Sequence, residues 1–343
     1  MLFRSALTKL LQEKRNAGVE ILDLTESNPT RAGLEYPEQQ ILQALADPAA
    51  LHYDPTPNGL YTAREAVSQY YAGLGADVSP SRILLTASTS EAYAYLFKLL
   101  TSPGDEGLVP RPSYPLFEYL AAMESVKVRQ YPLRYDGAWH IDFAALEELA
   151  GERTRAIVVV NPNNPTGTLA SRESVARLLA ELPPHVLLVM DEAYIEFLED
   201  PADCLGAIRS GAMPNVLISR TFSKVFGLAG LRVGYGVGSR EVISGMEKAR
   251  QPFNLNSLAQ AAASAALDDA AHLAKTRATN KGGLESLHDA FARMGLEFIR
   301  SHANFVLVRV GDGQRVFGEL QKRGVIVRPM AGYQLPEWIR VSV

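Results

Sequence analysis

Three segments of this 343-residue sequence carry side chains that could do chemistry, and each follows a run of apolar residues. Asn164 lies in the segment that follows the first run. Asp191 and Tyr194 follow the second run, and Lys224 follows the third, behind two hydroxyl residues. Together they offer an amide, a carboxylate with a phenol, and an amine. An amine that loses its proton readily can bond covalently to a carbonyl carbon.

This combination meets the requirements of a pyridine aldehyde cofactor. Such a cofactor needs an amine to hold it and a carboxylate at its ring nitrogen, which keeps the ring an electron sink. Its phenolic oxygen needs hydrogen-bond donors. Its phosphate needs hydroxyls, an arginine and the backbone amides of a helix N-terminus. The three segments and their neighbours contain every one of these groups.

The elements that must position these groups alternate between strand and helix patterns. Ser90–Leu100 and Ser171–Leu182 each place their apolar residues on one helical face. Continuous apolar runs, typical of strands buried on both faces, occur at Ile83–Ala87, Ala156–Asn161, Val186–Asp191, Val216–Thr221 and Leu231–Val237. The alternation predicts an α/β domain with helices on both faces of a sheet. Ligands of such sheets bind beyond the carboxyl ends of the strands, where the polar segments lie.

The two ends of the chain have a different pattern. Short helices and strands follow one another at Leu284–Gly295, Ala303–Val310, Val316–Arg323 and Val325–Arg328. This pattern predicts an α+β unit, and we expect the N-terminal forty residues to pack with it. The predicted division is a large domain over residues 46–275 and a small domain built from residues 1–45 and 276–343.

Composition argues against several classes of partner. The net charge of -4 gives no basic excess for nucleic acid or for a membrane surface. No apolar run of about 18 residues could span a bilayer, and the N-terminus lacks the features of a secretory signal. A single cysteine, Cys204, excludes an intrachain disulfide and fits a reducing compartment. We therefore expect a cytoplasmic protein with no membrane and no nucleic-acid partner.

Two further patterns predict no site. Gly234, Gly236 and Gly238 resemble a dinucleotide-binding loop, but they lack its spacing and no convincing helix opens after them. The six histidines show no ligand spacing, so we propose no metal site.

Three motifs in order resemble the signature of class I/II aminotransferases of fold type I. They are Asn164-Pro165-Thr166-Gly167, Asp191-x-x-Tyr194 and Ser223-Lys224-x7-Arg232. The segments RTFSKVFGLAGLRVGY, PFNLNSLAQAAASAAL and VIVRPMAGYQLPEWIRVSV are similar to the histidinol-phosphate aminotransferase branch in particular. The resemblance covers nearly the whole chain. It implies pyridoxal 5'-phosphate as cofactor, and a large domain with a mostly parallel seven-stranded sheet flanked by helices, beside a small α+β domain.

The resemblance also implies a role for each matching residue. Lys224 would carry the cofactor as a Schiff base and move the proton of the reaction. Asp191 would pair with the pyridine nitrogen, and Asn164 and Tyr194 would donate hydrogen bonds to the phenolic oxygen. Tyr114 would stack on the ring. The phosphate would be held by Ser88, Thr89, Ser90, Thr221, Ser223 and Arg232.

Other matches concern the substrate and a second subunit. Tyr53 matches a tyrosine that reaches the phosphate of the neighbouring subunit, which implies a homodimer with shared active sites. Arg340 matches an arginine that takes the substrate's carboxylate or phosphate, and Arg328 matches a second phosphate-contacting arginine. The candidate substrate contacts of the N-terminal segment are Asn28, Pro29 and Arg31.

Three functions are compatible with these residues. The first is amino transfer by a ping-pong mechanism, from histidinol phosphate or an aromatic or other L-amino acid to a 2-oxo acid, with 2-oxoglutarate expected. The second is decarboxylation of a phosphorylated amino acid, because the same cofactor supports several reactions on one fold. The third is a cofactor-binding protein without turnover, which loss of Lys224, Asp191 or Asn164 would have favoured.

Overall fold

The computed structural model describes residues 6–28, 30, 37–100, 102, 104–199 and 214–343. Pro29, Arg31 and Cys204 lie outside these ranges. Within them, no helix combines the length and the apolar character that crossing a membrane requires.

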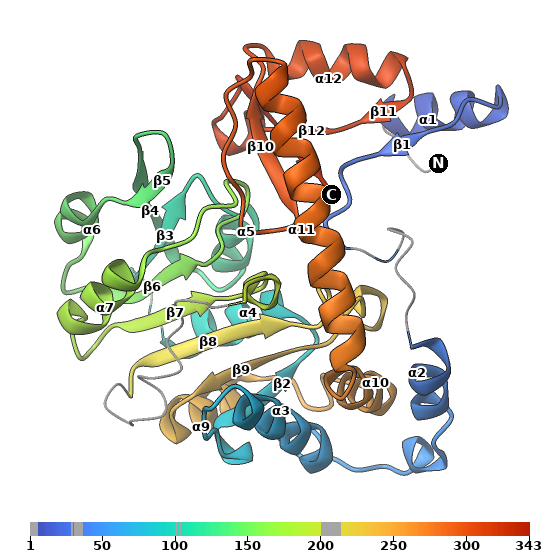
Figure 1. Ribbon diagram of the computed structural model, residues 1–343. Helices are drawn as coiled ribbons and strands as arrows, with labels where there is room; N and C mark the ends of the chain where they lie inside the picture. Colours follow the sequence, from blue (N-terminus) through green and yellow to red (C-terminus); the bar gives the residue numbers. More distant parts are fainter. Residues whose placement is uncertain (1–5, 29, 31–36, 101, 103, 200–213) are drawn as a thin grey trace.

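A mixed sheet forms the centre of the larger part of the molecule (Figure 1). Its strands are β2 (Ile83–Thr86), β3 (Glu106–Arg111), β4 (Lys127–Tyr135), β5 (Trp139–Ile141), β6 (Thr154–Val160), β7 (Leu187–Asp191), β8 (Val216–Thr221) and β9 (Gly234–Gly238). Their order in space is β2-β9-β8-β7-β6-β3-β4-β5. The run from β8 to β4 is parallel, β9 is antiparallel to both its neighbours, and β5 is antiparallel to β4. The sheet thus has eight described strands where seven were expected, because the short β5 extends its edge as a hairpin.

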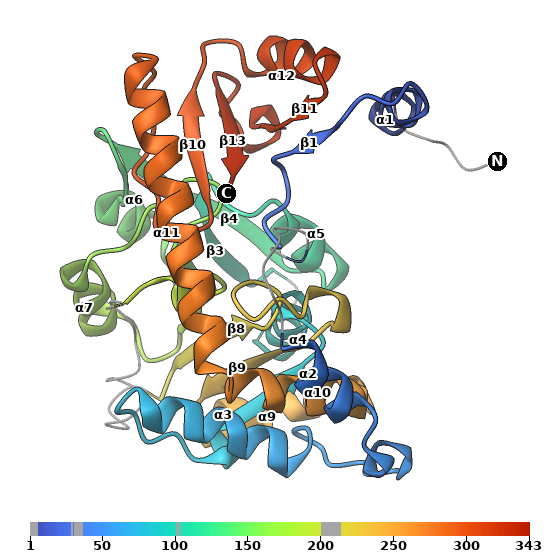
Figure 2. The ribbon, with the colours of Figure 1, turned by 45° about the vertical axis from the view of Figure 1, so that its right-hand side comes forward.

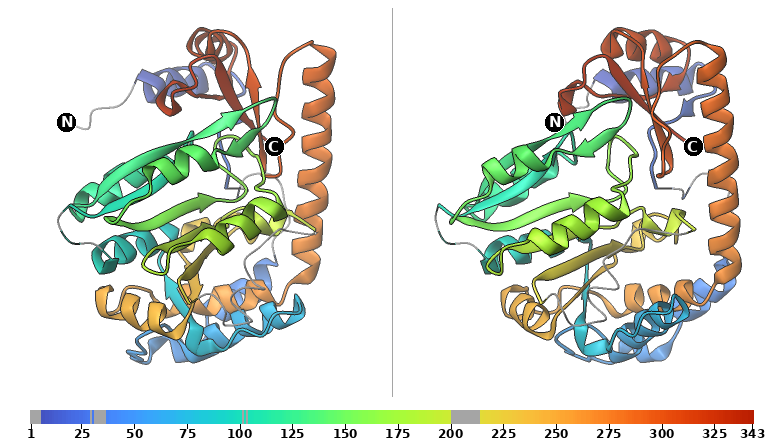
Figure 3. Two further views of the ribbon diagram at one scale, coloured as in Figure 1. Left: turned by 90° about the vertical axis from the view of Figure 1, so that its left-hand side faces the viewer. Right: turned by 60° about the vertical axis from the view of Figure 1, so that its left-hand side comes forward.

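Helices cover both faces of this sheet, as the alternation predicted (Figure 3). Ile157 and Val159 of β6 pack into one apolar core, and Ala156 and Val158 pack into another on the opposite face. The first core is closed by α3 (Tyr61–Gly73), α6 (Phe143–Leu149), α7 (Arg172–Glu181) and α10 (Ser257–Leu267). The second is closed by α4 (Thr89–Leu100), α5 (Leu116–Met123) and α9 (Arg240–Ala249). Strands buried on both sides explain the continuous apolar runs.

Several of these helices begin at residues whose side chains cap them. Ser171 Oγ accepts from the backbone N–H of Ser174 at 3.1 Å, at the start of α7. Asn256 Oδ1 accepts from the N–H of Ala259 at 2.7 Å, at the start of α10. Such a side chain replaces a carbonyl that the first turn lacks, and so fixes where each helix begins.

A smaller unit lies above the large sheet in Figure 1. Its strands β10 (Phe305–Arg309), β13 (Trp338–Ser342) and β12 (Arg328–Pro329) form one antiparallel sheet, while β1 (Leu22–Asp23) pairs with β11 (Val325–Ile326). Its helices are α1 (Ala6–Asn16) and α12 (Gly313–Lys322). The single strand expected at Val325–Arg328 is therefore wrong: β11 and β12 belong to different sheets.

The two parts are joined by α11 (Ala270–Arg293), which runs alongside both of them (Figure 2). The expected helix at Leu284–Gly295 is only the second half of α11. The N-terminal helix α2 (Glu38–Leu45) packs against α10, beside the large sheet. The domain limits given above stay a prediction.

Candidate active site

Three neighbouring parallel strands end at one place in the large sheet. Asp191 is the last residue of β7 and pairs in register with Val160 of β6 and Ser219 of β8. Asn164 follows β6, and Lys224 follows β8. Because β7 lies between the other two strands, the three predicted segments converge at the carboxyl edge of the sheet.

Lys224 lies at the centre of this group. Its Nζ donates to Asn28 Oδ1 at 2.9 Å and to Ser27 Oγ at 3.3 Å, and lies 5.1 Å from the centroid of the Tyr194 ring. The N-terminal segment therefore reaches the amine through Asn28, and the substrate contact expected of this residue stays a prediction. Ser27 was not predicted.

Asp191 is a buried carboxylate held from two directions. Its Oδ2 accepts from the Tyr93 hydroxyl at 2.8 Å, and its Oδ1 accepts from the N–H of Ala193 at 3.1 Å. Burial raises the pKa of Asp191, and the two hydrogen bonds and the Lys224 charge oppose this rise. The carboxylate is thus placed to face a cationic ligand.

Tyr194 is buried beside two cations. Burial acts to raise the pKa of its phenol, but the charges of Lys224 and Arg340, together with hydrogen bonds to Ser27 and Lys224, outweigh this effect, so the pKa lies below its ordinary value. The ring packs edge-on against Phe305, with centroids 5.4 Å apart. The phenol is therefore fixed and is a strong hydrogen-bond donor.

Arg340 joins the group from the small sheet. Its Nη1 donates to Asn164 Oδ1 at 2.6 Å, and its guanidinium lies 4.6 Å from the Phe305 ring. The residue is only 2% exposed, its Nε has no partner, and no described carboxylate lies within ion-pair distance. Burial lowers the pKa of Arg340. A buried cation without a counter-ion is a binding position for an anion.

The hydroxyl residues lie at two backbone turns. Ser88 Oγ accepts from the N–H of Glu91 at 3.3 Å, so that Ser88 caps α4, which begins at Thr89. The side chain of Ser90 forms a hydrogen bond with Tyr114. At the end of β8, Thr221 Oγ1 accepts from the N–H of Ser223 at 3.1 Å. The α4 N-terminus supplies the amides and partial positive charge that favour a phosphate.

Gly234 allows this helix start to lie close to the sheet. A Cβ at this position would lie 2.8 Å from the Arg220 carbonyl oxygen and 3.4 Å from the Ser88 carbonyl carbon. Gly234 and the glycines at 236 and 238 all lie within β9, so they form no dinucleotide loop. Among the residues that the structure describes, no group of acidic, histidine or cysteine side chains is arranged to hold a metal ion.

Three predicted residues have exposed side chains. Arg232 is exposed and donates to the Ala229 carbonyl at 2.8 Å. Arg328 is exposed, pairs in register with Arg340, and lies 6.0 Å from the Tyr333 ring. Tyr53 is 77% exposed.

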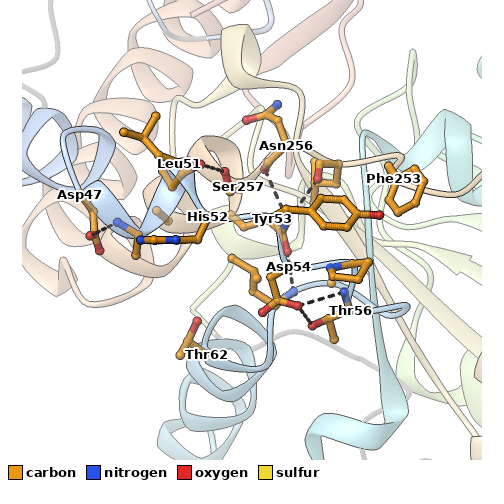
Figure 4. A pocket seen from close by; sticks show the side chains of 18 of the residues that line it. Asp47, Leu51, His52, Tyr53, Asp54, Thr56, Thr62, Phe253, Asn256 and Ser257 are labelled. Atoms are coloured by element: carbon orange, nitrogen blue, oxygen red, sulfur yellow. Dashed lines mark hydrogen bonds between the residues drawn. The ribbon is translucent and has the colours of Figure 1, made fainter.

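Tyr53 borders a separate groove of about 750 Å³. Its ring lies 5.6 Å from that of Phe253, and Figure 4 shows the two rings beside each other at the groove. Leu51 and Leu255 also line the groove, which opens between the η2 turn (Pro48–Leu51) and the start of α10.

The donor set fits pyridoxal phosphate. Lys224 supplies the amine and Asp191 the carboxylate for a ring nitrogen. The side-chain oxygen of Asn164 accepts from Arg340. The NH₂ group of Asn164 therefore remains to donate to a phenolic oxygen. Tyr194 is a second donor, and the capped start of α4 suits a phosphate.

Sequence reasoning overlooked two residues that touch the predicted ones. Tyr93 follows Ser90 by three residues, which places both on one face of α4, and this spacing was a usable signal. Ser27 lies in a segment without helix or strand, and no local sequence pattern predicts the path of that segment.

Comparisons with known proteins agree with the motifs. The sequence model of the family "Aminotransferase class I and II" matches residues 19–343. A histidinol-phosphate aminotransferase of Akkermansia muciniphila is 38% identical over 308 residues, which are 90% of this chain and 82% of that protein. The Symbiobacterium thermophilum enzyme of the same name is 37% identical, covering 94% and 86%. The structure of an aspartate aminotransferase double mutant of Thermus thermophilus matches with a TM-score of 0.85 at 27% identity, over 99% of this chain and 92% of that one.

Proposed function

We propose that this chain, which belongs to the class I and II aminotransferases and uses pyridoxal phosphate, takes its amino group from histidinol phosphate and passes it to 2-oxoglutarate by a ping-pong mechanism. The relatives named above support the donor. The observation that carries the proposal is the pair Arg340 and Arg328. A donor with a phosphate and an acceptor with two carboxylates both need cations at the position of the substrate's anionic group.

The arrangement of these two arginines suits such ligands. They are register partners on β13 and β12, so their side chains lie on the same face of the small sheet. Arg340 is buried and has an unpartnered Nε, whereas Arg328 is exposed. A buried guanidinium could bind a carboxylate or a phosphate oxygen, and a second one at the rim adds the charge that a phosphate needs.

The chain's own groups account for the remaining steps. When bound, pyridoxal phosphate supplies an electron sink for negative charge at the substrate's alpha carbon. Lys224 would hold the cofactor and, once the substrate has displaced it, its Nζ would carry the proton from the substrate's alpha carbon to the cofactor's C4′. Asp191 would stay opposite the ring nitrogen. Asn164 and Tyr194 would donate to the phenolic oxygen, and Tyr114 would stack on the ring.

The phosphate end of the cofactor would be held by the α4 start and the β8 turn. Ser88, Thr89 and Ser90 supply amides and hydroxyls there. The other contributors would be Thr221, Ser223 and Arg232. Asn28, which occupies Lys224 Nζ at 2.9 Å, would exchange this contact for the substrate.

We further propose that the enzyme is a homodimer whose subunits complete each other's sites. Tyr53 is a predicted phosphate contact, yet it is 77% exposed and stands against Phe253, which is 66% exposed. Leu51, 90% exposed, lines the same groove and extends the apolar surface beside them. Aromatic and aliphatic side chains gathered on one surface favour contact with a second copy.

A half-reaction tests the proposed activity. Cofactor-loaded enzyme is mixed with histidinol phosphate in the absence of any 2-oxo acid, and the oxo product is measured. One equivalent per subunit, followed by regeneration with 2-oxoglutarate, is the expected result. Carbon dioxide released from a phosphorylated amino acid would identify a decarboxylase instead. A loaded protein that converts no donor would contradict catalysis altogether.

Phosphate recognition has its own test. Arg328→Met should lower kcat/KM for histidinol phosphate about tenfold, because a charge-assisted hydrogen bond contributes about 1.5–3 kcal/mol. Histidinol, which lacks the phosphate, should be affected little. An equal loss with both donors would show that Arg328 does not read the phosphate.

A further inference from the structure

Tyr93 binds the Asp191 carboxylate inside the large sheet. Its hydroxyl donates to Oδ2 at 2.8 Å, and the two residues are 1% and 6% exposed. The backbone N–H of Ala193 holds the other oxygen at 3.1 Å. Each oxygen of the carboxylate therefore has one donor from the protein, and no described lysine or arginine lies within ion-pair distance of it.

The Tyr93 ring is fixed by two other aromatic rings. Phe117 meets it edge-on, with centroids 4.9 Å apart at 81°. Phe97 stacks beside it at 6.3 Å and 24°. This packing sets the direction of the hydroxyl, because the ring cannot tilt without displacing its neighbours.

The position of Tyr93 on α4 relates it to the rest of the site. Ser90 lies three residues earlier and so shares its helical face. The Ser90 side chain is hydrogen-bonded to Tyr114, and Ser88 caps the helix. One helix thus presents its N-terminus to the predicted phosphate position and Tyr93 to the predicted partner of the ring nitrogen.

We propose that Tyr93 is a positioning residue that holds the Asp191 carboxylate, in its ionised form, against the ring nitrogen of the cofactor. This inference rests on the proposed function, because it requires Asp191 to face that nitrogen. The Tyr93 hydroxyl stabilises the negative charge on Asp191. The proton between Asp191 and the ring nitrogen would therefore stay on the nitrogen. A protonated ring nitrogen makes the ring a stronger electron sink.

The electrostatics of the pair support this assignment. Burial alone favours the neutral carboxyl and raises the pKa of Asp191, and the bond from Tyr93 works against this rise. Burial and the nearby Asp191 charge raise the pKa of Tyr93 well above its ordinary value. The phenol therefore keeps its proton and remains a donor throughout the neutral range.

Tyr93→Phe removes the hydroxyl and leaves the ring packing in place. The readout is the pH at which the ring nitrogen loses its proton, followed by NMR of cofactor labelled with ¹⁵N in the ring and bound to the full-length protein. We expect this pH to fall by about one unit, and cofactor affinity and kcat to fall about tenfold, the value of one charge-assisted hydrogen bond.

Tyr131→Phe is the matched control. Tyr131 belongs to β4 and is also fully buried, and its hydroxyl donates to the Val158 carbonyl at 2.8 Å rather than to Asp191. The Tyr131→Phe variant should lose about as much stability as Tyr93→Phe, but its ¹⁵N titration should equal that of wild type. A Tyr93→Phe titration identical to that of wild type would overturn the proposal.

A double-mutant cycle separates positioning from packing. If Tyr93 acts through Asp191, Tyr93→Phe should have no further effect on the ¹⁵N titration or on cofactor affinity in an Asp191→Asn background. The same loss in both backgrounds would refute the link. Should Tyr93→Phe not fold, 3-fluorotyrosine at position 93, a stronger donor, should raise the titration pH; an unchanged or lower pH contradicts the proposal.

These readouts do not depend on turnover. A protein that binds the cofactor but transfers no amino group would contradict the proposed function and still allow the Tyr93 titration. Normal turnover with an unmoved titration would overturn the Tyr93 inference alone.

Discussion

Two buried arginines, Arg220 and Arg340, have very different partners. Arg220 is 1% exposed and pairs with Glu192 at 2.8 Å and with Glu196 at 3.6 Å. Arg340 is 2% exposed, and among the residues that the structure describes it hydrogen-bonds only to the neutral amide of Asn164. Arg220 belongs to an internal ion cluster, whereas Arg340 has no described counter-ion, so the proposed anionic substrate would compensate its charge.

Substituting each arginine with methionine tests this contrast. Arg340→Met should raise KM for donor and acceptor about 100-fold, but leave the Tm of the apoenzyme within about 2 °C or raise it, because an unpaired buried charge is removed. Arg220→Met strands two buried carboxylates and should lower Tm by about 5–10 °C. Steady-state kinetics and thermal unfolding report both. A large Tm loss for Arg340→Met would show that it stabilises the fold itself.

Glu196 gives the fold a specific pH dependence. Burial raises its pKa to about 7 from 4.5, with the Arg220 charge opposing the rise. The folded state therefore binds the proton more tightly than the unfolded chain, and this residue's contribution to stability falls as pH rises between those values. Glu196→Gln should make the decline over that window shallower by up to about 3 kcal/mol in urea unfolding. The exposed Glu147→Gln should not, and parallel curves for both variants would contradict the assignment.

At the scale of the element, the start of α4 is fastened by one carboxylate. Glu91 accepts from the N–H of Ala87 at 2.6 Å and from Asn254 Nδ2 at 2.8 Å. It links the helix start to the loop before α10, beside the groove that Tyr53 borders. Backbone amides can bind a phosphate only if they are held in place.

Removing this fastening should affect the cofactor more than the fold. Glu91→Ala should cost about 1–2 kcal/mol of stability and weaken cofactor binding about tenfold, measured by titration of the apoenzyme. Asp142→Ala removes a comparable cap, the 3.1 Å bond to the Ala145 N–H at the start of α6, far from the site. It should cost about 1 kcal/mol with unchanged affinity. Equal affinity in both variants would separate Glu91 from the phosphate position.

Uniform burial made a strand easier to predict, although β3, which is buried over most of its length, was overlooked. The runs ending at Asp191 and Thr221 became β7 and β8, with starts within one residue of those expected. By contrast, β4 was overlooked, because it is mostly half-buried and carries charges and a proline. The first half of α11 is polar around Lys275–Lys281 and has no apolar period that would announce it.

Some residues of the candidate site could likewise be predicted from the sequence, and others could not. Lys224, Asp191, Asn164 and Arg340 were predictable, because each belongs to a motif or a strand end. Their partners Tyr93 and Ser27 were overlooked. The spacing of Tyr93 from Ser90 indicates only a shared helix face, and neither contact follows from local sequence, because the two contacts join segments 98 and 197 residues apart. Tertiary packing alone decides such pairs.

At the scale of the whole molecule, the N-terminal segment ties the small sheet to Lys224. Leu24 donates to the Ile326 carbonyl and accepts from Ser342 N–H, and Asn304 Nδ2 donates to the Ser27 carbonyl at 3.1 Å. Ser27 and its neighbour Asn28 then reach Lys224 Nζ. A shift of the small sheet would therefore carry these side chains with it, and Arg340 as well.

The proposed homodimer can be tested with mixed dimers of two variants. If Tyr53 serves the partner's site, a mixed dimer of Lys224→Ala and Tyr53→Phe subunits has one site with both defects. Its other site contains the intact Lys224 and Tyr53. Purified with two different affinity tags, this heterodimer should show about half of wild-type activity, although the first parent is inactive and the second is weakened about tenfold at limiting cofactor. Sedimentation at the assay concentration checks that it stays dimeric. Activity equal to the mean of the two parents would mean that Tyr53 acts only within its own subunit.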